Sequence, residues 1–217
     1  MLKLYYHPLS SYCWKALIAL YENGTPFEKV LVDFGDPASR DAFYALWPIG
    51  QFPVVRDEPR DRLVPESSII VEYLDDHYPG MTRFIPEDTD KAREVRMRDR
   101  FFDLHIHIHM QKITGDRIRP DGKTDPFGVE NARTRMATAL GMVEQGIGED
   151  WQIGDAFTLA DISAAPALFY ADKIVGLTDK YPKTWAYLER LKARPSFSRT
   201  LREAEPYFHM FPQEKTP

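Results

Sequence analysis

Two adjacent serines, Ser10 and Ser11, stand at the start of a helix-like segment, where their hydroxyls could take part in chemistry. Residues 2–6 are typical of a short strand, and the apolar residues between positions 13 and 20 recur at helical spacing. The start of a helix presents free backbone N–H groups and a partial positive charge, which favour an anion such as a thiolate or a carboxylate. A serine hydroxyl at this point can donate a hydrogen bond to sulfur. Serine is also a common helix N-cap, and this ordinary structural role is the alternative.

The single cysteine, Cys13, lies on the apolar side of the same predicted helix. We expect a packed thiol without a reactive role, because a buried thiol is usually inert. One cysteine cannot form an internal disulfide and cannot build a cysteine-rich zinc site. The spacing from Ser10 to Cys13 is that of a thioredoxin-type dithiol whose first sulfur has been replaced, which excludes a dithiol reductase.

Three histidines, His105, His107 and His109, raise the question of a metal site. On a helix, positions 105 and 109 share a face, whereas position 107 points in nearly the opposite direction, so the three rings cannot converge on one ion. We therefore expect no metal. The apolar residues expected on the core face of this helix are Phe101, Leu104 and Ile108.

The elements that must position these residues follow the order β-α-β-α-β-β-α over the first part of the chain. After the second strand, Asp36 and Pro37 predict an N-cap and the first position of a helix. A hairpin is predicted from the apolar stretches 52–55 and 63–64, and a third helix opens at residue 66.

The rest of the chain has long periodic stretches and no alternating strand pattern, which predicts helices. Thr158 and Asp161 have the types and spacing of a capping box, so we expect a sharply defined helix start there. We expect two domains, an α/β domain over 1–80 and an all-helical domain over 90–217, joined by a linker at 81–89.

Four short segments make a larger pattern. They are Ser10-Ser11-Tyr12-Cys13-Trp14-Lys15, Gln51-Phe52-Pro53, Glu66-Ser67, and Gly154-Asp155-Ala156-Phe157-Thr158-Leu159-Ala160-Asp161. In this order the chain resembles the cytosolic glutathione transferases over nearly its whole length, and its N-terminal motif is similar to serine-type, theta- or zeta-like members, bacterial ones included. The resemblance implies an α/β thioredoxin-like N-terminal domain of order βαβαββα, followed by an all-α C-terminal helical bundle domain.

The resemblance also implies roles for the residues of the first segment. Ser10 falls where serine-type members keep the hydroxyl that stabilises the glutathione thiolate, and Ser11 is the second choice. Tyr12 stands where the zeta class, whose members isomerise maleyl compounds, has a cysteine. We expect Tyr12 in the pocket for the electrophile, with His105 and His109 from the helix that lines it. A surface or core role for these two histidines is the alternative.

The remaining matches describe where the tripeptide would bind. Pro53 matches the family's cis-proline, which turns the backbone of Phe52 so that its N–H and C=O pair with the cysteinyl part of glutathione. A cis bond before proline costs only ~0.5–1 kcal/mol. Gln51 would lie near the same stretch of ligand. Glu66 and Ser67 match the acid and the hydroxyl that bind the γ-glutamyl amine and carboxylate.

These residues predict a glutathione S-transferase that uses glutathione as a co-substrate, needs no metal, and activates the thiol for attack on a small electrophile. A non-catalytic glutathione-binding or regulatory protein on the same fold is one alternative, and a maleyl-type cis-trans isomerase is another. The resemblance implies a homodimer. We expect substrate choice to depend on residues 101–119 and 205–213.

The composition narrows the range of partners. A net charge of −5 and a pI near 5.7 argue against nucleic acid, because phosphate contacts need an excess of clustered Lys and Arg. No apolar stretch is long enough to span a bilayer, and the N-terminus is not organised as a signal peptide. We therefore expect a cytoplasmic protein without a membrane partner.

Overall fold

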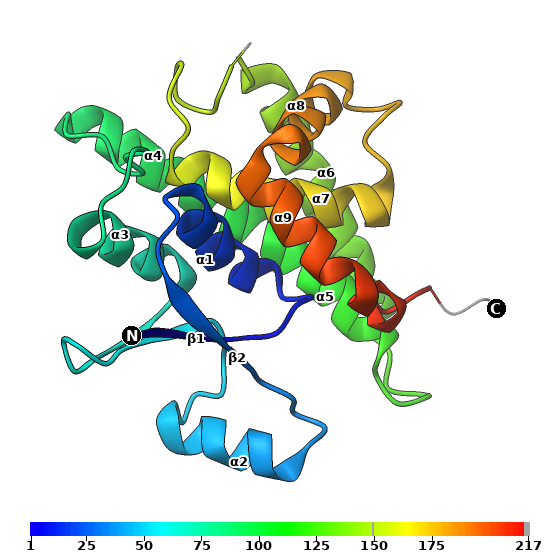
Figure 1. Ribbon diagram of the computed structural model, residues 1–217. Helices are drawn as coiled ribbons and strands as arrows, with labels where there is room; N and C mark the ends of the chain where they lie inside the picture. The colour runs from blue at the N-terminus through cyan, green and yellow to red at the C-terminus, as the bar shows by residue number, and fades with distance from the viewer. Residues whose placement is uncertain (149, 215–217) are drawn as a thin grey trace.

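A mixed sheet organises the first part of the chain (Figure 1). The computed structural model describes residues 1–148 and 150–214. The strands lie in the order β2-β1-β3-β4, with β1 parallel to β2 and antiparallel to β3, and with β3 antiparallel to β4. Their bounds are Leu2–Tyr6 for β1, Phe27–Leu31 for β2, Val54–Asp57 for β3 and Arg62–Pro65 for β4.

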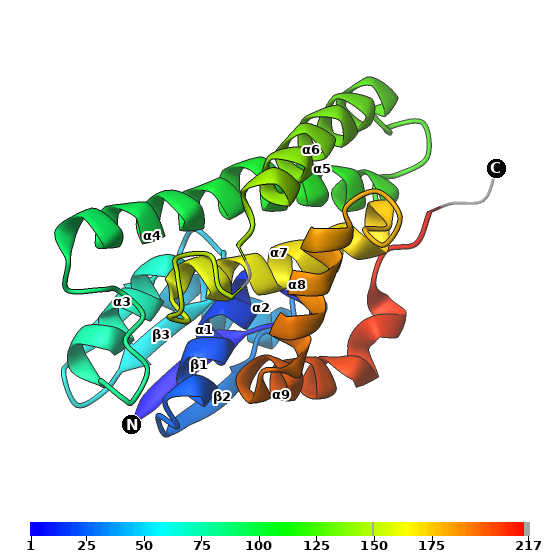
Figure 2. The same cartoon turned by 90° about the horizontal axis from the view of Figure 1, so that it is seen from above.

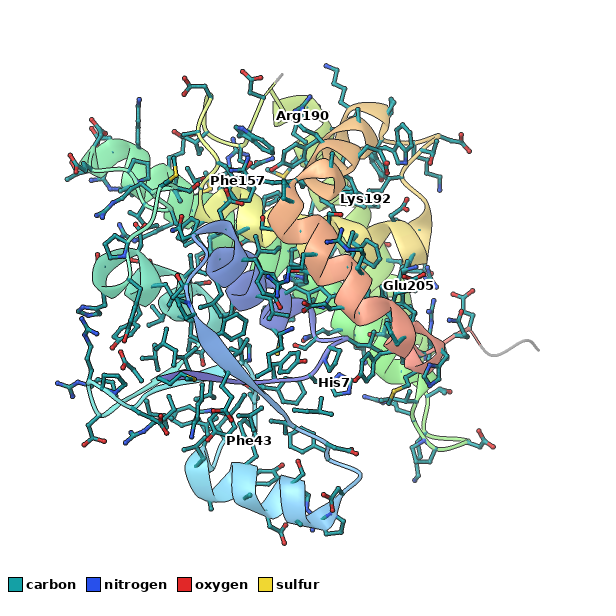
Figure 3. All side chains as sticks on the ribbon, in the orientation of Figure 1. His7, Phe43, Phe157, Arg190, Lys192 and Glu205 are labelled. Atoms are coloured by element: carbon teal, nitrogen blue, oxygen red, sulfur yellow. The ribbon has the colours of Figure 1, made fainter. Side chains whose placement is uncertain are left out.

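Helices cover both faces of this sheet, as the alternation of side chains along its strands requires. Leu4 of β1 and Val55 of β3 point into the main core, whereas Val54 belongs to a small core with Phe43 of α2. Phe43 is labelled in Figure 3, where it lies between α2 and the sheet. The three helices are α1 (Ser11–Glu22), α2 (Pro37–Leu46) and α3 (Ser67–His77). The predicted order βαβαββα is confirmed.

The second part of the chain is helical throughout its described residues apart from turns and one isolated bridge. Figure 2 shows α4 and α5 as one long run beside α6, with α7 between them and α1. Within the described residues, no helix has both the length and the apolar character needed to cross a membrane. The elements are α4 (Thr89–Phe102), the π-helical turn η1 (Asp103–His107), α5 (Ile108–Arg117), α6 (Pro126–Gly146), α7 (Leu159–Val175), α8 (Pro182–Ala193), α9 (Pro195–Ala204) and the 3₁₀ turn η2 (Glu205–Met210).

The predicted capping box at the start of α7 is confirmed. The Thr158 Oγ1 accepts from the Ala160 backbone N–H at 3.3 Å, and the Asp161 carboxylate accepts from the Thr158 backbone N–H at 2.9 Å. The same carboxylate accepts from the Gln152 backbone N–H at 2.8 Å and from the Tyr187 hydroxyl at 2.6 Å. Asp161 is fully buried, so it anchors the start of the central helix to α8 and to the loop before α7.

The predicted core face of the helix over residues 101–109 is wrong in part. Leu104 and Ile108 are 52% and 49% exposed, while Ile106 and His107 are buried. The reason is the π-helical turn η1, whose i→i+5 hydrogen bonding spaces its residues differently from an α-helix and shifts the face that follows. A pattern based on 3.6 residues per turn cannot anticipate this shift.

A buried ammonium group joins the two domains. Lys15 of α1 is fully buried, and its Nζ lies 2.7 Å from Asp99 Oδ1, 2.8 Å from Asp103 Oδ2 and 2.8 Å from Ser68 Oγ. Ser163 of α7 donates to Asp99 Oδ1 at 2.5 Å. We call Lys15, Ser68, Asp99, Asp103 and Ser163 the interdomain network. It links α1, α3, α4, η1 and α7 through one charge cluster.

Candidate active site

Ser10 is the N-cap of α1, and its hydroxyl lines the cavity described below. Its backbone is extended, with φ −74° and ψ 116°, and its Oγ accepts from the Cys13 backbone N–H at 3.2 Å. An oxygen that accepts this bond can still donate its own hydrogen. Capping and donation to a ligand, which the sequence left as alternatives, are therefore compatible in one side chain.

The neighbours of Ser10 are more deeply placed. Ser11 is the first residue of α1 and is only 4% exposed. Cys13 is fully buried, as predicted, and burial raises the pKa of its thiol to about 12. The Cys13 thiol is therefore neutral near pH 7, and of the two serines Ser10 is the less enclosed.

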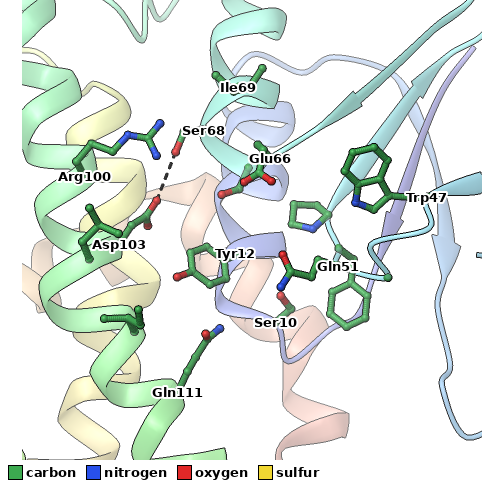
Figure 4. A pocket seen from close by; sticks show the side chains of 16 residues that line it. Ser10, Tyr12, Trp47, Gln51, Glu66, Ser68, Ile69, Arg100, Asp103 and Gln111 are labelled. Atoms are coloured by element: carbon green, nitrogen blue, oxygen red, sulfur yellow. Dashed lines mark hydrogen bonds between the residues drawn. The ribbon is translucent and has the colours of Figure 1, made fainter. Parts of the chain in front are cut away.

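A cavity of about 620 Å³ opens between the first domain and the run of α4, η1 and α5 (Figure 4). It brings together seven of the residues that the sequence predicted, although Ser11 is not among the residues that line it. Those seven are Ser10, Tyr12, Gln51, Phe52, Pro53, Glu66 and Ser67. One concave site thus collects residues from α1, the loop before β3, and the start of α3.

The loop before β3 is shaped by two backbone features. The Phe52–Pro53 peptide bond is cis, as the resemblance implied. Gly50 has φ +69°, and a Cβ there would come within 2.4 Å of the Tyr44 ring, so another residue would be strained and would displace that ring. Gln51 follows directly and reaches the cavity (Figure 4).

The start of α3 presents an acid and a hydroxyl to the same cavity. Glu66 occupies the N-cap position with φ +69°, a left-handed conformation that costs a non-glycine residue ~1–3 kcal/mol. Its carboxylate makes no capping bond to the helix, so it stays available to a ligand. Ser67, the first residue of α3, is 6% exposed and lines the cavity beside the free N–H groups of the helix end.

The opposite wall of the cavity comes from the helical domain. Leu104 and Ile108, which the sequence analysis placed in the core, supply apolar surface there. Arg100 and Gln111 add a cation and an amide, and no hydrogen bond involves either side chain within the described residues. This wall combines apolar surface with hydrogen-bond donors.

A second cavity of about 250 Å³ adjoins the first, and Ser10, Phe52 and Gln111 line both. Ser11 lines this smaller one. Its other lining residues fall mostly in the segments 101–119 and 205–213, where substrate choice is predicted. They are Leu9, Met110, Thr114, Tyr170, Phe211 and Pro212.

The three histidines have different surroundings. His105 is exposed, with its ring 5.2 Å from that of Phe101, and His109 is half-buried. Neither lines either cavity, so the structure does not bring them to the other predicted site residues. The π-helical turn η1 explains why these two histidines point away from the cavity. It changes which residues face the cavity, and Leu104 and Ile108 line it instead. No group of His, Cys, Asp and Glu suited to a metal ion occurs in residues 1–148 and 150–214.

His107 is the buried member of the three and belongs to a chain of contacts. Its Nδ1 lies 3.2 Å from Asp103 Oδ1, and its ring centroid lies 4.8 Å from that of Tyr12. Burial lowers the pKa of His107, so the neutral ring donates its Nδ1–H to the carboxylate. Burial opposes ionisation of Asp103, but the bond from His107 and the charge of Lys15 outweigh it and lower the Asp103 pKa to about 2.

The sequence analysis expected segments 101–119 and 205–213 to contribute to the site, but it missed which of their side chains line it, such as Leu104 and Ile108, and it missed the interdomain network. One signal was present, namely Lys15 within the apolar run from Cys13 to Leu20. A charged residue on a buried helix needs a partner, which predicts a carboxylate from elsewhere. Nothing in the pattern indicated that Asp99 and Asp103 would supply it.

Comparison with known proteins finds a matching family model for each of the two parts of the chain. Residues 4–82 match the family model "Glutathione S-transferase, N-terminal domain", and residues 126–190 match "Glutathione S-transferase, C-terminal domain". Glutathione S-transferase 3 of Zea mays is 31% identical over 208 residues, which cover 92% of this chain and 93% of the relative. Maleylacetoacetate isomerase of Pseudomonas aeruginosa is 27% identical over 94% of this chain and 96% of its own.

The fold also matches solved structures. A glutathione S-transferase from Methylobacillus flagellatus, crystallised with glutathione bound, superposes with a TM-score of 0.84 at 26% identity and covers 92% of this chain and 98% of its own. The α/β thioredoxin-like domain and the all-α domain are therefore both confirmed. Sequence identity, the matches to both domains and the shared fold agree that this chain belongs to the glutathione S-transferase family.

Proposed function

We propose that Ser10 donates a hydrogen bond to the sulfur of glutathione and stabilises its thiolate for attack on a small electrophile. The observation that carries this proposal is the hydroxyl of Ser10 at the N-terminus of α1, on the wall of the cavity that also holds Gln51, Glu66 and Ser67. One pKa unit corresponds to ~1.4 kcal/mol, which one charge-assisted hydrogen bond and a helix terminus can supply.

The remaining cavity residues would hold the tripeptide. The backbone of Phe52, turned by the cis bond to Pro53, would pair with the cysteinyl part, with Gln51 beside it. Glu66 and Ser67 would bind the γ-glutamyl amine and carboxylate. The donor set suits a zwitterionic peptide, because it offers a free carboxylate, hydroxyls and the helix end of α3 side by side.

The test is an ultraviolet difference titration with glutathione from low to high pH, in which the thiolate absorbance reports ionisation of the bound thiol. In the wild type we expect the thiolate to appear well below the pKa of free glutathione. In Ser10→Ala we expect that pKa to rise and turnover to fall roughly 10- to 100-fold, with binding retained. Cys13 does not interfere, because its own pKa lies near 12.

Ser11→Ala is the matched control, because it removes a neighbouring hydroxyl outside the larger cavity. A thiolate pKa that rises in Ser11→Ala and not in Ser10→Ala would transfer the role to Ser11. Saturable binding without any lowered thiol pKa, and without turnover of a panel of electrophiles, would favour the non-catalytic glutathione-binding protein.

One observation favours isomerase activity as a second candidate. The alignment with the isomerase from Pseudomonas aeruginosa covers 94% of this chain. The name of that protein, maleylacetoacetate isomerase, refers to maleylacetoacetate. Tyr12, however, stands where the resembling class has cysteine. Incubation with maleylacetoacetate and glutathione tests the candidate, and isomerisation that requires glutathione would support it.

The wider organisation is proposed on the same basis. We expect a homodimer, a small electrophile as the second substrate, a cytoplasmic location, and domain limits at 1–80 and 90–217 with a linker at 81–89. Sedimentation at micromolar concentration tests the dimer. Limited proteolysis within the linker tests the domain limits.

A further inference from the structure

A turn over residues 7–10 carries the chain from β1 to Ser10 at the start of α1. The Ser10 backbone N–H donates to the His7 carbonyl oxygen at 3.0 Å, and proline occupies the second position, as β-turns favour. The His7 side chain closes the turn a second time, because its Nδ1 accepts from the Leu9 backbone N–H at 3.2 Å. Figure 3 labels His7 in this loop. One histidine thus fixes the backbone N–H of Ser10 and that of the residue before it.

The carbonyl groups of the same turn are fixed by the helical core. The Pro8 oxygen accepts from the Trp14 indole N–H at 2.6 Å, and the Leu9 oxygen accepts from the Tyr170 hydroxyl at 2.7 Å. Both donors belong to large buried side chains. The bond from the Leu9 N–H to His7 is different, because it depends on a smaller ring that has to present an acceptor.

The surroundings of the His7 ring keep that acceptor available. The ring stacks on that of Phe52, with centroids 6.0 Å apart, and the ring of Tyr207 in η2 lies 6.4 Å away on the same measure. Asp33, which follows β2, is the charged group that acts on the imidazole. Partial burial lowers the pKa of His7 more than Asp33 raises it, so the ring is neutral near pH 7 and its Nδ1 can accept.

We propose that His7 is a positioning residue, whose neutral ring accepts from the Leu9 N–H and so holds the turn that presents the Ser10 hydroxyl to the glutathione thiol. His7 lines neither cavity, so it acts through Ser10 and does not touch the ligand. The inference rests on the proposed function, since it needs a thiolate that Ser10 stabilises. It adds a residue behind the site on which the placement of that hydroxyl depends.

Two substitutions separate the acceptor from the ring. His7→Phe keeps a ring against Phe52 and removes the acceptor. His7→Asn removes the ring and keeps an acceptor, because an asparagine oxygen at the first position of a turn accepts from the N–H two residues on. At saturating glutathione, we expect His7→Phe to lower the ionisation constant of the bound thiol about three- to tenfold, and His7→Asn to stay within about twofold of wild type. The thiolate absorbance measures this constant.

A double-mutant cycle tests whether His7 acts through Ser10. In Ser10→Ala the hydroxyl is absent, so the placement of the turn no longer affects the bound thiol. We therefore expect His7→Phe to leave the ionisation constant within about twofold in the Ser10→Ala background. His77→Phe, which replaces an exposed histidine of the same domain outside both cavities, is the matched control and should change neither background.

Three results would overturn the inference. They are an unchanged ionisation constant in His7→Phe, a loss of similar size in His7→Asn, and a full effect of His7→Phe in the Ser10→Ala background. Urea unfolding checks that the variants are folded, and His7→Leu takes the place of His7→Phe in the same cycle if the latter is not. A wild type that binds glutathione without lowering its thiol pKa would contradict the proposed function instead, and that result is visible before any His7 variant is made.

Discussion

Single side chains in this site combine a structural task with a chemical one. Ser10 accepts a backbone hydrogen bond that caps α1, and the same side chain lines the cavity. Glu66 has a positive φ at the start of α3, and its carboxylate makes no capping hydrogen bond to the helix. Substitutions at these residues must therefore be chosen so that only the chemical task is removed.

Glu66→Gln removes the charge and keeps the shape of the side chain. If Glu66 binds the γ-glutamyl amine, the loss of a charge-assisted hydrogen bond should raise the glutathione Kd about tenfold or more. Isothermal titration calorimetry measures this change. Glu58→Gln neutralises a carboxylate of the same domain outside the cavity lining and should leave the Kd unchanged. Equal affinities for Glu66→Gln and wild type would remove Glu66 from the binding site.

At this scale the sequence predicted many of the residues by which the first domain lines the cavity, but not Trp47, Gly50, Ser68 and Ile69. The motif around Pro53 led to the correct expectation of a cis bond, and Ser10 and Glu66 were placed at helix starts where they occur. The packing of Tyr12 on His107 could not be predicted, because the two residues are 95 positions apart and meet only in the folded chain.

Among the elements, α7 shows how one short motif sets a helix start. All residues of α7 from Leu159 to Leu168 are buried, so the backbone N–H groups at its start have little access to water. The capping box supplies the hydrogen bonds that water would otherwise provide. The position of α7 against α1 and α4 therefore depends on Thr158 and Asp161.

Substitutions in this box should differ in cost. Thr158→Ala should lower the free energy of unfolding by ~1 kcal/mol, the usual value of an N-cap. Asp161→Ala should cost at least ~3 kcal/mol, because it leaves the Gln152 N–H, the Thr158 N–H and the Tyr187 hydroxyl without an acceptor. Urea unfolding measures both values. Thr138→Ala on the exposed face of α6 is the control, and equal costs for all three variants would contradict the prediction.

Helices and strands were predicted correctly where the spacing of apolar residues is regular. The prediction failed where that spacing changes within a helix. The order of strands and helices in the first domain follows from alternation, helical spacing and the Asp36-Pro37 helix start, all of which are local signals. The turn η1 is different, because no local signal in residues 103–107 distinguishes its π-helical hydrogen bonding from that of an ordinary helix. The exposed positions of Leu104 and Ile108 follow from that turn.

At the scale of the whole molecule, the interdomain network makes the free energy of unfolding fall at low pH, because Asp103 is held in its ionised form. The folded pKa of Asp103, about 2, lies below the ~3.9 expected for an unfolded chain. Its contribution is therefore complete above pH ~4 and is lost as the pH falls toward 2. The difference corresponds to roughly 2.5 kcal/mol of unfolding free energy, of which about 2 kcal/mol is lost between pH 5 and pH 2.

This prediction is checked by urea unfolding between pH 5 and pH 2. Asp103→Asn should be less stable than wild type at pH 5, and its further loss on acidification should be smaller by about 2 kcal/mol. Parallel stability curves for the two proteins would show that Asp103 does not titrate with folding.

The interdomain network also affects the design of chimeras in which one domain of this chain is joined to a domain from another protein. One ammonium group from the first domain pairs with two carboxylates of the second, so a chimera that joined either domain to a foreign partner would leave buried charges without these partners. A graft that carried Lys15 and Ser68 together with Asp99, Asp103 and Ser163 would keep these hydrogen bonds and ion pairs. These five positions would therefore have to be exchanged together, although they lie on both sides of the domain boundary.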